Sequence, residues 1–175
     1  MSDSPEEPSK HSGSGRKGKA VEHLIAASCI LSSGGELNAS TSLVDDEGVD
    51  IVFHRRGSSR TLAVQVKSRF DEEGGSTHLH KQGIFIGDVR TVTFQPRDNL
   101  YLLFVAVRSR DADFGPVWFV PSHEFAAKAQ RLNGDPPRIR RMSASAKPDS
   151  QDQWRQYRLY KSDLAPAILT ALDRL

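Results

Sequence analysis

The chain has 175 residues, a formal net charge of +2 and one cysteine, Cys29. The length and a hydrophobic content of 37% suit a globular protein with a core of its own. A lone cysteine excludes an internal disulfide and a zinc site built from thiolates, and this favours a reducing compartment. No stretch has the pattern of a signal peptide or enough apolar residues to span a membrane, so we expect a cytoplasmic protein.

The N-terminal part of the chain divides into a polar tail and a helix. Residues 1–17 contain no aliphatic residue after Met1, and this composition predicts a disordered tail before a single domain at 18–175. Apolar residues at helical spacing predict a helix over 19–33. Glu22 lies at the edge of its apolar face. It is either a surface carboxylate paired with a nearby lysine or an acid that reaches a site over a sheet, and both interpretations stay open.

Alternating and continuous apolar runs predict the remaining elements. Strands are expected at 37–44, 49–55, 60–68, 100–107, 117–120 and 154–160, and helices are expected to begin at the caps Ser122 and Ser162. The run LYLLFVAV at 100–107 is apolar on both faces, which is typical of a central strand. The fold class is therefore α/β, with a central mixed β-sheet flanked by helices.

Two polar segments are candidates for contacts with a ligand. Residues 69–82 contain glycine and two histidines, His78 and His80, and we expect a mobile loop there without the further ligands that zinc needs. The segment RIRRM at 138–142 predicts an edge strand that presents arginines. Those arginines either contact nucleic acid or guard a solvated sheet edge, and the sequence leaves both interpretations open.

The stretch GVDIVFHRRGSSRTLAVQVK, from Gly48 to Lys67, predicts a β-hairpin that gathers polar groups. Side chains alternate along a strand, so Gln65 and Lys67 share one face. Depending on the centre of the turn, Asp50 lies opposite Gln65 or opposite Lys67. A register that pairs Asp50 with Val66 is disfavoured because it would put the polar residues on two faces. An acid, an amide and an ammonium should therefore converge.

These groups form a site of hard oxygen ligands, which suits Mg²⁺ or Mn²⁺ and suits zinc poorly. The expected ligands are Asp50, the side-chain oxygen of Gln65, the backbone carbonyl of Val66 and, if it reaches the site, Glu22. Lys67 would orient or help to deprotonate a water molecule and would stabilise charge on a phosphate. A plain salt bridge between Asp50 and Lys67 is the less favoured alternative, because polar groups in an otherwise apolar strand need a reason.

The order of a helix glutamate, GxD at the start of a hairpin and QxK at its end resembles the PD-(D/E)XK nuclease superfamily. Glutamine in place of the middle acid resembles the variant of Mrr-like restriction endonucleases and of relatives of Holliday-junction resolvases. The resemblance covers about residues 19–68. It implies a restriction-endonuclease-like fold, a homodimer in many members, and site positions filled by Glu22, Asp50, Gln65 and Lys67.

The resemblance and the residues together predict a metal-dependent endonuclease that hydrolyses phosphodiester bonds, with DNA favoured over RNA as substrate, in restriction, defence or DNA processing. A neutral amide at Gln65 should hold Mg²⁺ more weakly than a carboxylate would. The alternative is a catalytically inactive nuclease fold that binds nucleic acid or serves as a subunit. A small-molecule enzyme has no supporting motif, since neither a Gly-rich phosphate loop nor a nucleophilic triad is found.

Overall fold

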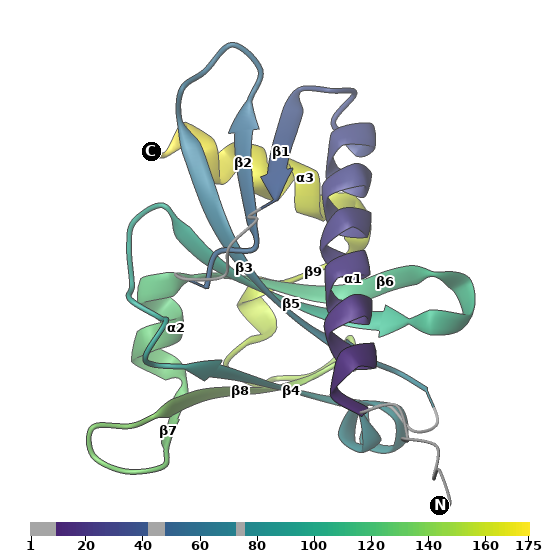
Figure 1. Cartoon of the computed structure of the whole chain (residues 1–175), viewed down its shortest axis with the longest axis vertical. Helices are drawn as coiled ribbons and strands as arrows, with labels where there is room; N and C mark the ends of the chain where they lie inside the picture. The colour runs from purple at the N-terminus through teal and green to yellow at the C-terminus, as the bar shows by residue number, and fades with distance from the viewer. Residues whose placement is uncertain (1–9, 42–47, 73–75) are drawn as a thin grey trace, which may run out of the picture.

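The structure is a computed structural model that describes residues 10–41, 48–72 and 76–175, with side chains from residue 15 onward. Its described strands form two sheets (Figure 1). The larger sheet has the order β1 (Leu37–Thr41), β2 (Ile51–Arg55), β3 (Thr61–Phe70), β5 (Leu100–Arg108), β6 (Asp113–Pro121) and β9 (Arg158–Leu159). The smaller sheet has the order β4 (Ile84–Arg90), β8 (Ile139–Ser145) and β7 (Gln130–Leu132).

The larger sheet is mixed, as the sequence predicts. Strand β3 pairs with β5 in parallel, and the other neighbouring pairs are antiparallel. Strand β5 is central because its run of apolar residues buries side chains on both faces of the sheet. Leu103 and Val105 belong to one core cluster, whereas Leu102 and Phe104 belong to the other.

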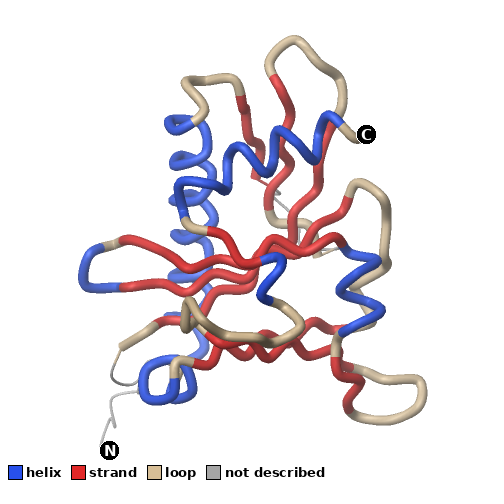
Figure 2. The backbone as a smooth tube through the Cα atoms, turned by 180° about the vertical axis from the view of Figure 1, so that it is seen from behind, coloured by secondary structure: helices blue, strands red, loops and turns tan. Residues whose placement is uncertain are grey.

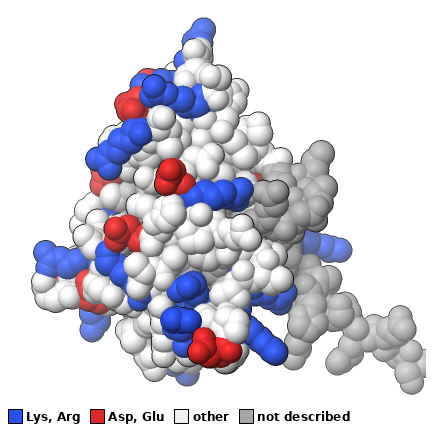
Figure 3. Space-filling model, turned by 90° about the vertical axis from the view of Figure 1, so that its left-hand side faces the viewer, with Lys and Arg blue, Asp and Glu red and all other residues white. Residues whose placement is uncertain are grey.

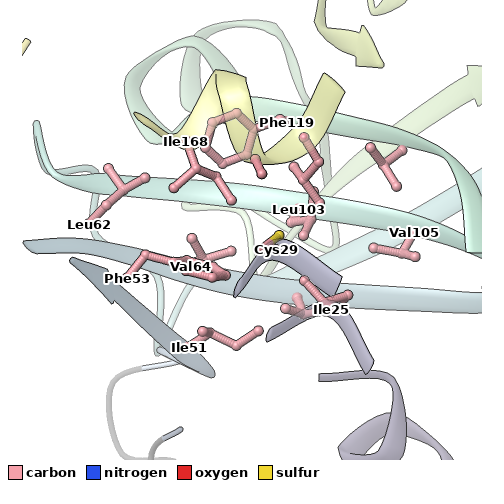
Figure 4. Packing of buried hydrophobic residues seen from close by; sticks show 14 of the residues in the cluster. Ile25, Cys29, Ile51, Phe53, Leu62, Val64, Leu103, Val105, Phe119 and Ile168 are labelled. Carbon is pink, nitrogen blue, oxygen red and sulfur yellow. The ribbon is translucent and has the colours of Figure 1, made fainter. Parts of the chain in front are cut away.

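Two helices cover the first face of this sheet. Helix α1 (Lys10–Ser32) packs Val21, Ile25 and Cys29 against it, and helix α3 (Lys161–Asp173) packs a stripe that includes Ile168. Figure 4 shows Ile25 and Cys29 beside Val64 and Leu103 on the strands. The apolar side chains on this face are fully or almost fully buried, so they fix the layer of helices on the sheet.

The second face is covered by the smaller sheet and by helix α2 (Ser122–Lys128), as the view from behind also shows (Figure 2). The two sheets approach each other closely at Gly87, where an added Cβ would lie 2.6 Å from the ring of Phe104. Phe85 and Trp118 pack in the same layer, with ring centroids 5.3 Å apart. The molecule therefore has three layers, with the larger sheet in the middle.

The helix at the N-terminus is longer than the sequence predicts. Residues 10–17, which we expected in a disordered tail, form the first turns of α1, and residues 1–9 lie outside the described part. The Nζ of Lys17 lies 2.8 Å from a carboxylate oxygen of Glu72 and 5.1 Å from the ring centroid of Phe70. These tertiary contacts favour a helix over a segment whose glycines and serines alone predict coil.

Three expectations about the second half of the chain are wrong. Ser162 is the second residue of α3 rather than its cap. Ser122 is the first residue of α2 rather than its cap, and its hydroxyl exchanges hydrogen bonds with the backbone N–H and C=O of Arg97. The arginine-rich segment forms β8, which is the middle strand of the smaller sheet instead of an edge. Arg141 pairs there with Asp88, and Arg140 donates to the carbonyl of Ala126, so neither side chain is a free surface charge.

Smaller differences concern the ends and connections of elements. Strand β1 is described only to Thr41, and residues 42–47, which include the end of the strand expected at 37–44, lie outside the described part. The expected loop at 69–82 contains the end of β3 and the π-helix η1 (His78–Gln82). The expected strand at 154–160 is mostly a 3₁₀ turn, η3 (Arg155–Tyr157), because Trp154 is buried in the second core cluster and the chain turns around it.

No helix in the described ranges is both long enough and apolar enough to cross a lipid bilayer.

Short 3₁₀ segments, η2 (Ser109–Asp111) between β5 and β6 and η3 before β9, complete the described elements.

Candidate active site

The register of the β2–β3 hairpin agrees with one of the two predicted pairings. Ile51 pairs with Val64, so Asp50 comes next to the position of Gln65 rather than that of Lys67. Asp50 itself precedes β2, and its backbone N–H donates to the carbonyl of Val64 at 3.0 Å. The turn at Gly57 therefore brings the acid to the middle of β3.

The carboxylate of Asp50 is bonded to the backbone of β3. The N–H of Val66 donates a hydrogen bond of 2.6 Å to its Oδ2. The sequence predicts that Asp50 lies on the same face as Gln65, but this bond holds its carboxylate along the strand edge instead. β2 pairs with β3 only as far as Val64, whereas β5 pairs with β3 as far as Phe70, so the N–H of Val66 bonds to the Asp50 carboxylate instead of to a strand backbone.

The backbone carbonyl of Val66 points to the same edge as its N–H, because the two groups of one residue in a strand point to the same side. The carboxylate of Asp50 occupies the position at which an extension of β2 toward its N-terminus would pair with Val66. The carboxylate of Asp50 and the backbone carbonyl of Val66 thus lie together at the N-terminal end of β2. Two hard oxygen donors are the result.

Gln65 and Lys67 share the second face of the sheet, as predicted. Their partners in β5 are Leu102 and Phe104, which line the core toward the smaller sheet. Val66 belongs to the opposite core, under the helices. Gln65 is buried, with 4% of its surface exposed, whereas Lys67 is half-buried. Among the described residues, no hydrogen bond or ion pair engages the Nζ of Lys67.

Gly48 makes room for the amide of Gln65. Its φ is +66°, and a Cβ at this position would lie 2.6 Å from Nε2 of Gln65 and 3.2 Å from the carbonyl oxygen of Thr93. Any side chain here would be strained and would collide with Gln65. Gly48 therefore leaves space for the side chain of Gln65, a role that we did not predict from the sequence. The GxD motif contains this glycine and could have indicated it.

Glu22 lies on α1, which packs on the opposite face from the side chains of Gln65 and Lys67. It is 9% exposed, and its Oε2 lies 2.7 Å from Nζ of Lys19. The pairing with a nearby lysine was one interpretation of this residue, but its burial is not that of a surface carboxylate. The structure therefore places Glu22 in the helix layer, separated from the second face by the sheet.

A charged cluster lies beyond the C-terminal half of β3, and sequence reasoning missed it. Asp88 of β4 forms a two-fold hydrogen-bonded ion pair with Arg141 of β8, at 2.7 and 2.8 Å. The hydrogen bond from Arg141 lowers the pKa of the Asp88 carboxyl below its ordinary value. Burial lowers the pKa of the Arg69 guanidinium, and the negative charge of Asp88 opposes that shift. The sequence did not predict this cluster because residues 84–90, which carry Asp88, were not predicted to form a strand.

The hydrogen bonds of His78 and His80 are made to residues outside the candidate site. His80 Nδ1 lies 3.0 Å from Asp71 Oδ1, and His78 Nδ1 lies 3.2 Å from Gln82 Oε1. Within 10–41, 48–72 and 76–175, no group of three or more His, Cys, Asp or Glu side chains is placed to hold a metal ion. Any ion at β3 would therefore depend on amide and peptide oxygens together with Asp50.

The overall fold is similar to that of a known nuclease. The structure matches that of a bacterial homing endonuclease, I-Ssp6803I, with a TM-score of 0.53 and 18% sequence identity, over 90% of this chain and 93% of that chain. Comparisons with protein-family models and with curated protein sequences gave no match. The chain thus has an α/β fold with a central mixed sheet flanked by helices, similar to an endonuclease fold.

Proposed function

We propose that the protein is a metal-dependent endonuclease of the PD-(D/E)XK type, in its QxK variant, that hydrolyses phosphodiester bonds in DNA. The observation that carries the proposal is the hydrogen bond between Val66 N–H and Asp50, which holds an acid beside the QxK strand. The similarity of the fold to a homing endonuclease supports it.

The donor set around Val66 fits a hard cation. Asp50, the Gln65 side-chain oxygen and the Val66 carbonyl would hold Mg²⁺ or Mn²⁺, because both ions prefer oxygen ligands and commonly use only one or two carboxylates. A bound ion would lower the pKa of a water molecule and neutralise charge on the phosphate. Gly48 keeps the amide of Gln65 in position, since its missing side chain leaves space for Nε2.

Lys67 would act on the water and on the phosphate. It follows Gln65 on the same face, and the described residues leave its ammonium without an ion partner. An ammonium in this position can donate hydrogen bonds to a phosphate oxygen and orient the attacking water. The hydrogen bonds stabilise the negative charge that develops on the phosphate oxygens in the transition state, and the oriented water is placed to attack phosphorus.

Glu22 would approach the same edge from the helix side. Because the Val66 carbonyl lies at a strand edge, ligands can reach it from both faces of the sheet. The buried Glu22 carboxylate already has a cation beside it, Lys19, which would be displaced or shared when a metal ion binds. We propose Glu22 as a further, outer contributor to the metal site.

A second candidate function is a catalytically inactive nuclease fold that binds nucleic acid or serves as a subunit. The neutral Gln65 favours it, as does the finding that no cluster of three acidic or metal-binding side chains exists in the described ranges. Charged side chains of both signs interleave on the side of the molecule shown in Figure 3. Nucleic-acid binding by this protein would thus rest on local groups of cations and would weaken with salt.

A metal titration followed by thermal shift separates the two candidates. The nuclease proposal predicts that Mg²⁺ or Mn²⁺ raises the melting temperature of the wild type and not that of Asp50→Asn. The control is Asp135→Asn, which removes the same charge from a side chain that is 96% exposed. An inactive fold would show salt-dependent DNA binding that EDTA does not change, and no metal-dependent shift.

The substrate is tested with plasmid DNA, single-stranded DNA and RNA in parallel. We expect Mg²⁺-dependent cleavage of DNA in preference to RNA. Cleavage of both strands by one active centre per chain calls for two copies, so we also expect a homodimer. Light scattering of the full chain with and without DNA measures that state.

A further inference from the structure

A pocket of about 420 Å³ lies between the end of the β5–β6 hairpin and the start of α3. Its lining combines cationic side chains with aromatic ones and includes the first two residues of α3, Lys161 and Ser162. The proposed nuclease function uses none of these residues.

Three cationic residues and one acidic residue line this pocket. Arg108, Arg158 and Lys161 line it, and Asp113 is the acidic residue of the lining. Asp113 accepts hydrogen bonds of 2.6 Å from both Arg108 and Lys161. The lining therefore carries a net charge of about +2, which favours an anion.

Arg158 has hydrogen-bonding capacity that the protein does not use. One terminal nitrogen donates to the carbonyl of Ala146 at 3.0 Å. Its Nε is buried and has no hydrogen-bond partner in the described part of the chain. The buried Nε is out of reach of a ligand, but the guanidinium as a whole lines the pocket, and its positive charge favours a bound oxyanion.

Tyr160 provides a flat surface beside these cations. It is 63% exposed, which is unusual for a large aromatic residue, and it lines the pocket. The guanidinium carbon of Arg158 lies 5.8 Å from the ring centroid, so a cation already occupies one side of the ring. The exposed remainder of the ring can stack with a planar group.

We infer that this pocket binds the phosphate group of a nucleotide, with Arg108, Arg158 and Lys161 around the phosphate and Tyr160 stacked on the base. Two strands separate it from the candidate nuclease site, because Lys67 aligns with Arg158 through Phe104 and Trp118 across β5 and β6. Three strand spacings amount to about 14 Å. The pocket shares no residue with the proposed nuclease site, so nucleotide binding here and cleavage there can each fail without the other.

The test is isothermal titration of the full chain with inorganic phosphate, AMP and adenosine. We expect phosphate to bind, AMP to bind about fivefold more tightly or better because its base stacks on Tyr160, and adenosine not to bind measurably. Tyr160→Ala should reduce the affinity for AMP to that for phosphate. Saturable binding that is lost in both Lys161→Gln and Arg158→Gln supports the pocket.

The matched control is Arg110→Gln, which removes a charge from the same hairpin at an exposed residue outside the lining. It should bind AMP like the wild type, and circular dichroism confirms that the variants are folded. A thymidine oligonucleotide with and without a terminal phosphate identifies the source of the phosphate group: a preference for the phosphorylated strand indicates a strand end, and binding of AMP alone indicates a free nucleotide. Absence of phosphate and AMP binding, or equal losses in Arg110→Gln and Lys161→Gln, would overturn the inference.

Discussion

The carboxylate of Asp50 accepts a hydrogen bond of 2.6 Å from the backbone N–H of Val66, just before the first residue of β2 and beside the part of β3 that continues past it. This contact joins the acid of the hairpin to the residue between Gln65 and Lys67. It has a structural consequence and a chemical one, and suitable variants separate the two.

Asp50→Asn and Asp50→Ala should differ in stability but agree in activity. The asparagine retains an oxygen that can accept from Val66, whereas the alanine leaves a partly buried N–H without its partner. We expect Asp50→Ala to lower the free energy of unfolding by about 1–3 kcal/mol relative to Asp50→Asn, measured by urea denaturation. Both should lose metal-dependent cleavage. Equal stability of the two variants would show that the bond is not formed in solution.

Gln65→Glu should bind Mg²⁺ more tightly than the wild type, because a carboxylate adds a negative charge to the ligand set. Without metal, the same change should destabilise the protein, since the side chain is 4% exposed and burial opposes ionisation. Thermal shift with and without Mg²⁺ measures both effects. Gln130→Glu adds the same charge at an exposed position of β7 and should show neither. Identical metal titrations of wild type and Gln65→Glu would argue against an ion at this residue.

Gly48→Ala should perturb Gln65, and Gly57→Ala is its matched control. Both glycines have a positive φ, +66° and +76°, so the backbone strain of the alanine is similar. Only at Gly48 would the new Cβ meet other atoms, at 2.6 Å from Gln65. We expect both variants to lose about 1 kcal/mol of stability and only Gly48→Ala to lose cleavage beyond that effect. Parallel losses of activity would contradict the role of Gly48.

Gly87→Ala tests the contact between the two sheets. An added Cβ would lie 2.6 and 2.7 Å from ring atoms of Phe104, which is fully buried. Overpacking of this kind costs about 1–3 kcal/mol, and we expect a loss in that range by urea denaturation. Combining Gly87→Ala with Phe104→Leu, which shortens the side chain, should recover part of the loss. If the double variant were no more stable than Gly87→Ala, the contact with Phe104 would not be the source of the strain.

The Asp88–Arg141 pair should make stability depend on pH in the acid range. Because Arg141 lowers the pKa of Asp88 in the folded state, the pair stabilises the protein above the ordinary value of 3.8 and loses this effect as the pH falls through the lowered pKa. Asp88→Asn should therefore be less stable than the wild type at neutral pH, with a difference that shrinks in acid. Urea denaturation at a series of pH values measures it. A difference independent of pH would mean that the pair is not coupled to folding.

The sequence predicts the hairpin and its polar residues well because two local signals agree. Glycine and serine mark the turn, and the alternation of Gln65 and Lys67 with valines fixes the face of each side chain. The central strand at 100–107 is also confirmed, because a continuous apolar run of this length is typical of a strand that is buried on both faces.

Long-range contacts determine what the sequence does not reveal. Gly87 breaks the apolar pattern of β4 in the sequence, although the strand itself is continuous, and its missing side chain leaves room for the ring of Phe104 in the larger sheet. Without β4, the segment at 138–142 looks like an edge strand. In the first turns of α1, Lys17 pairs with Glu72, which is 55 residues further along the chain. The bond from Val66 to Asp50 is likewise a tertiary contact, so a face could be predicted for Asp50 but not its position at the strand edge.

The measurement that tests the central claim most directly is the rate of cleavage of supercoiled plasmid DNA in Mg²⁺ by the wild type and by Lys67→Ala. Lys147→Ala, at an exposed lysine far along the chain, is the matched control. We predict that the wild type and Lys147→Ala cleave at similar rates, that EDTA abolishes cleavage, and that Lys67→Ala is slower by about 100-fold or more. Equal cleavage by wild type and Lys67→Ala, or no metal-dependent cleavage by the wild type, would contradict the proposal.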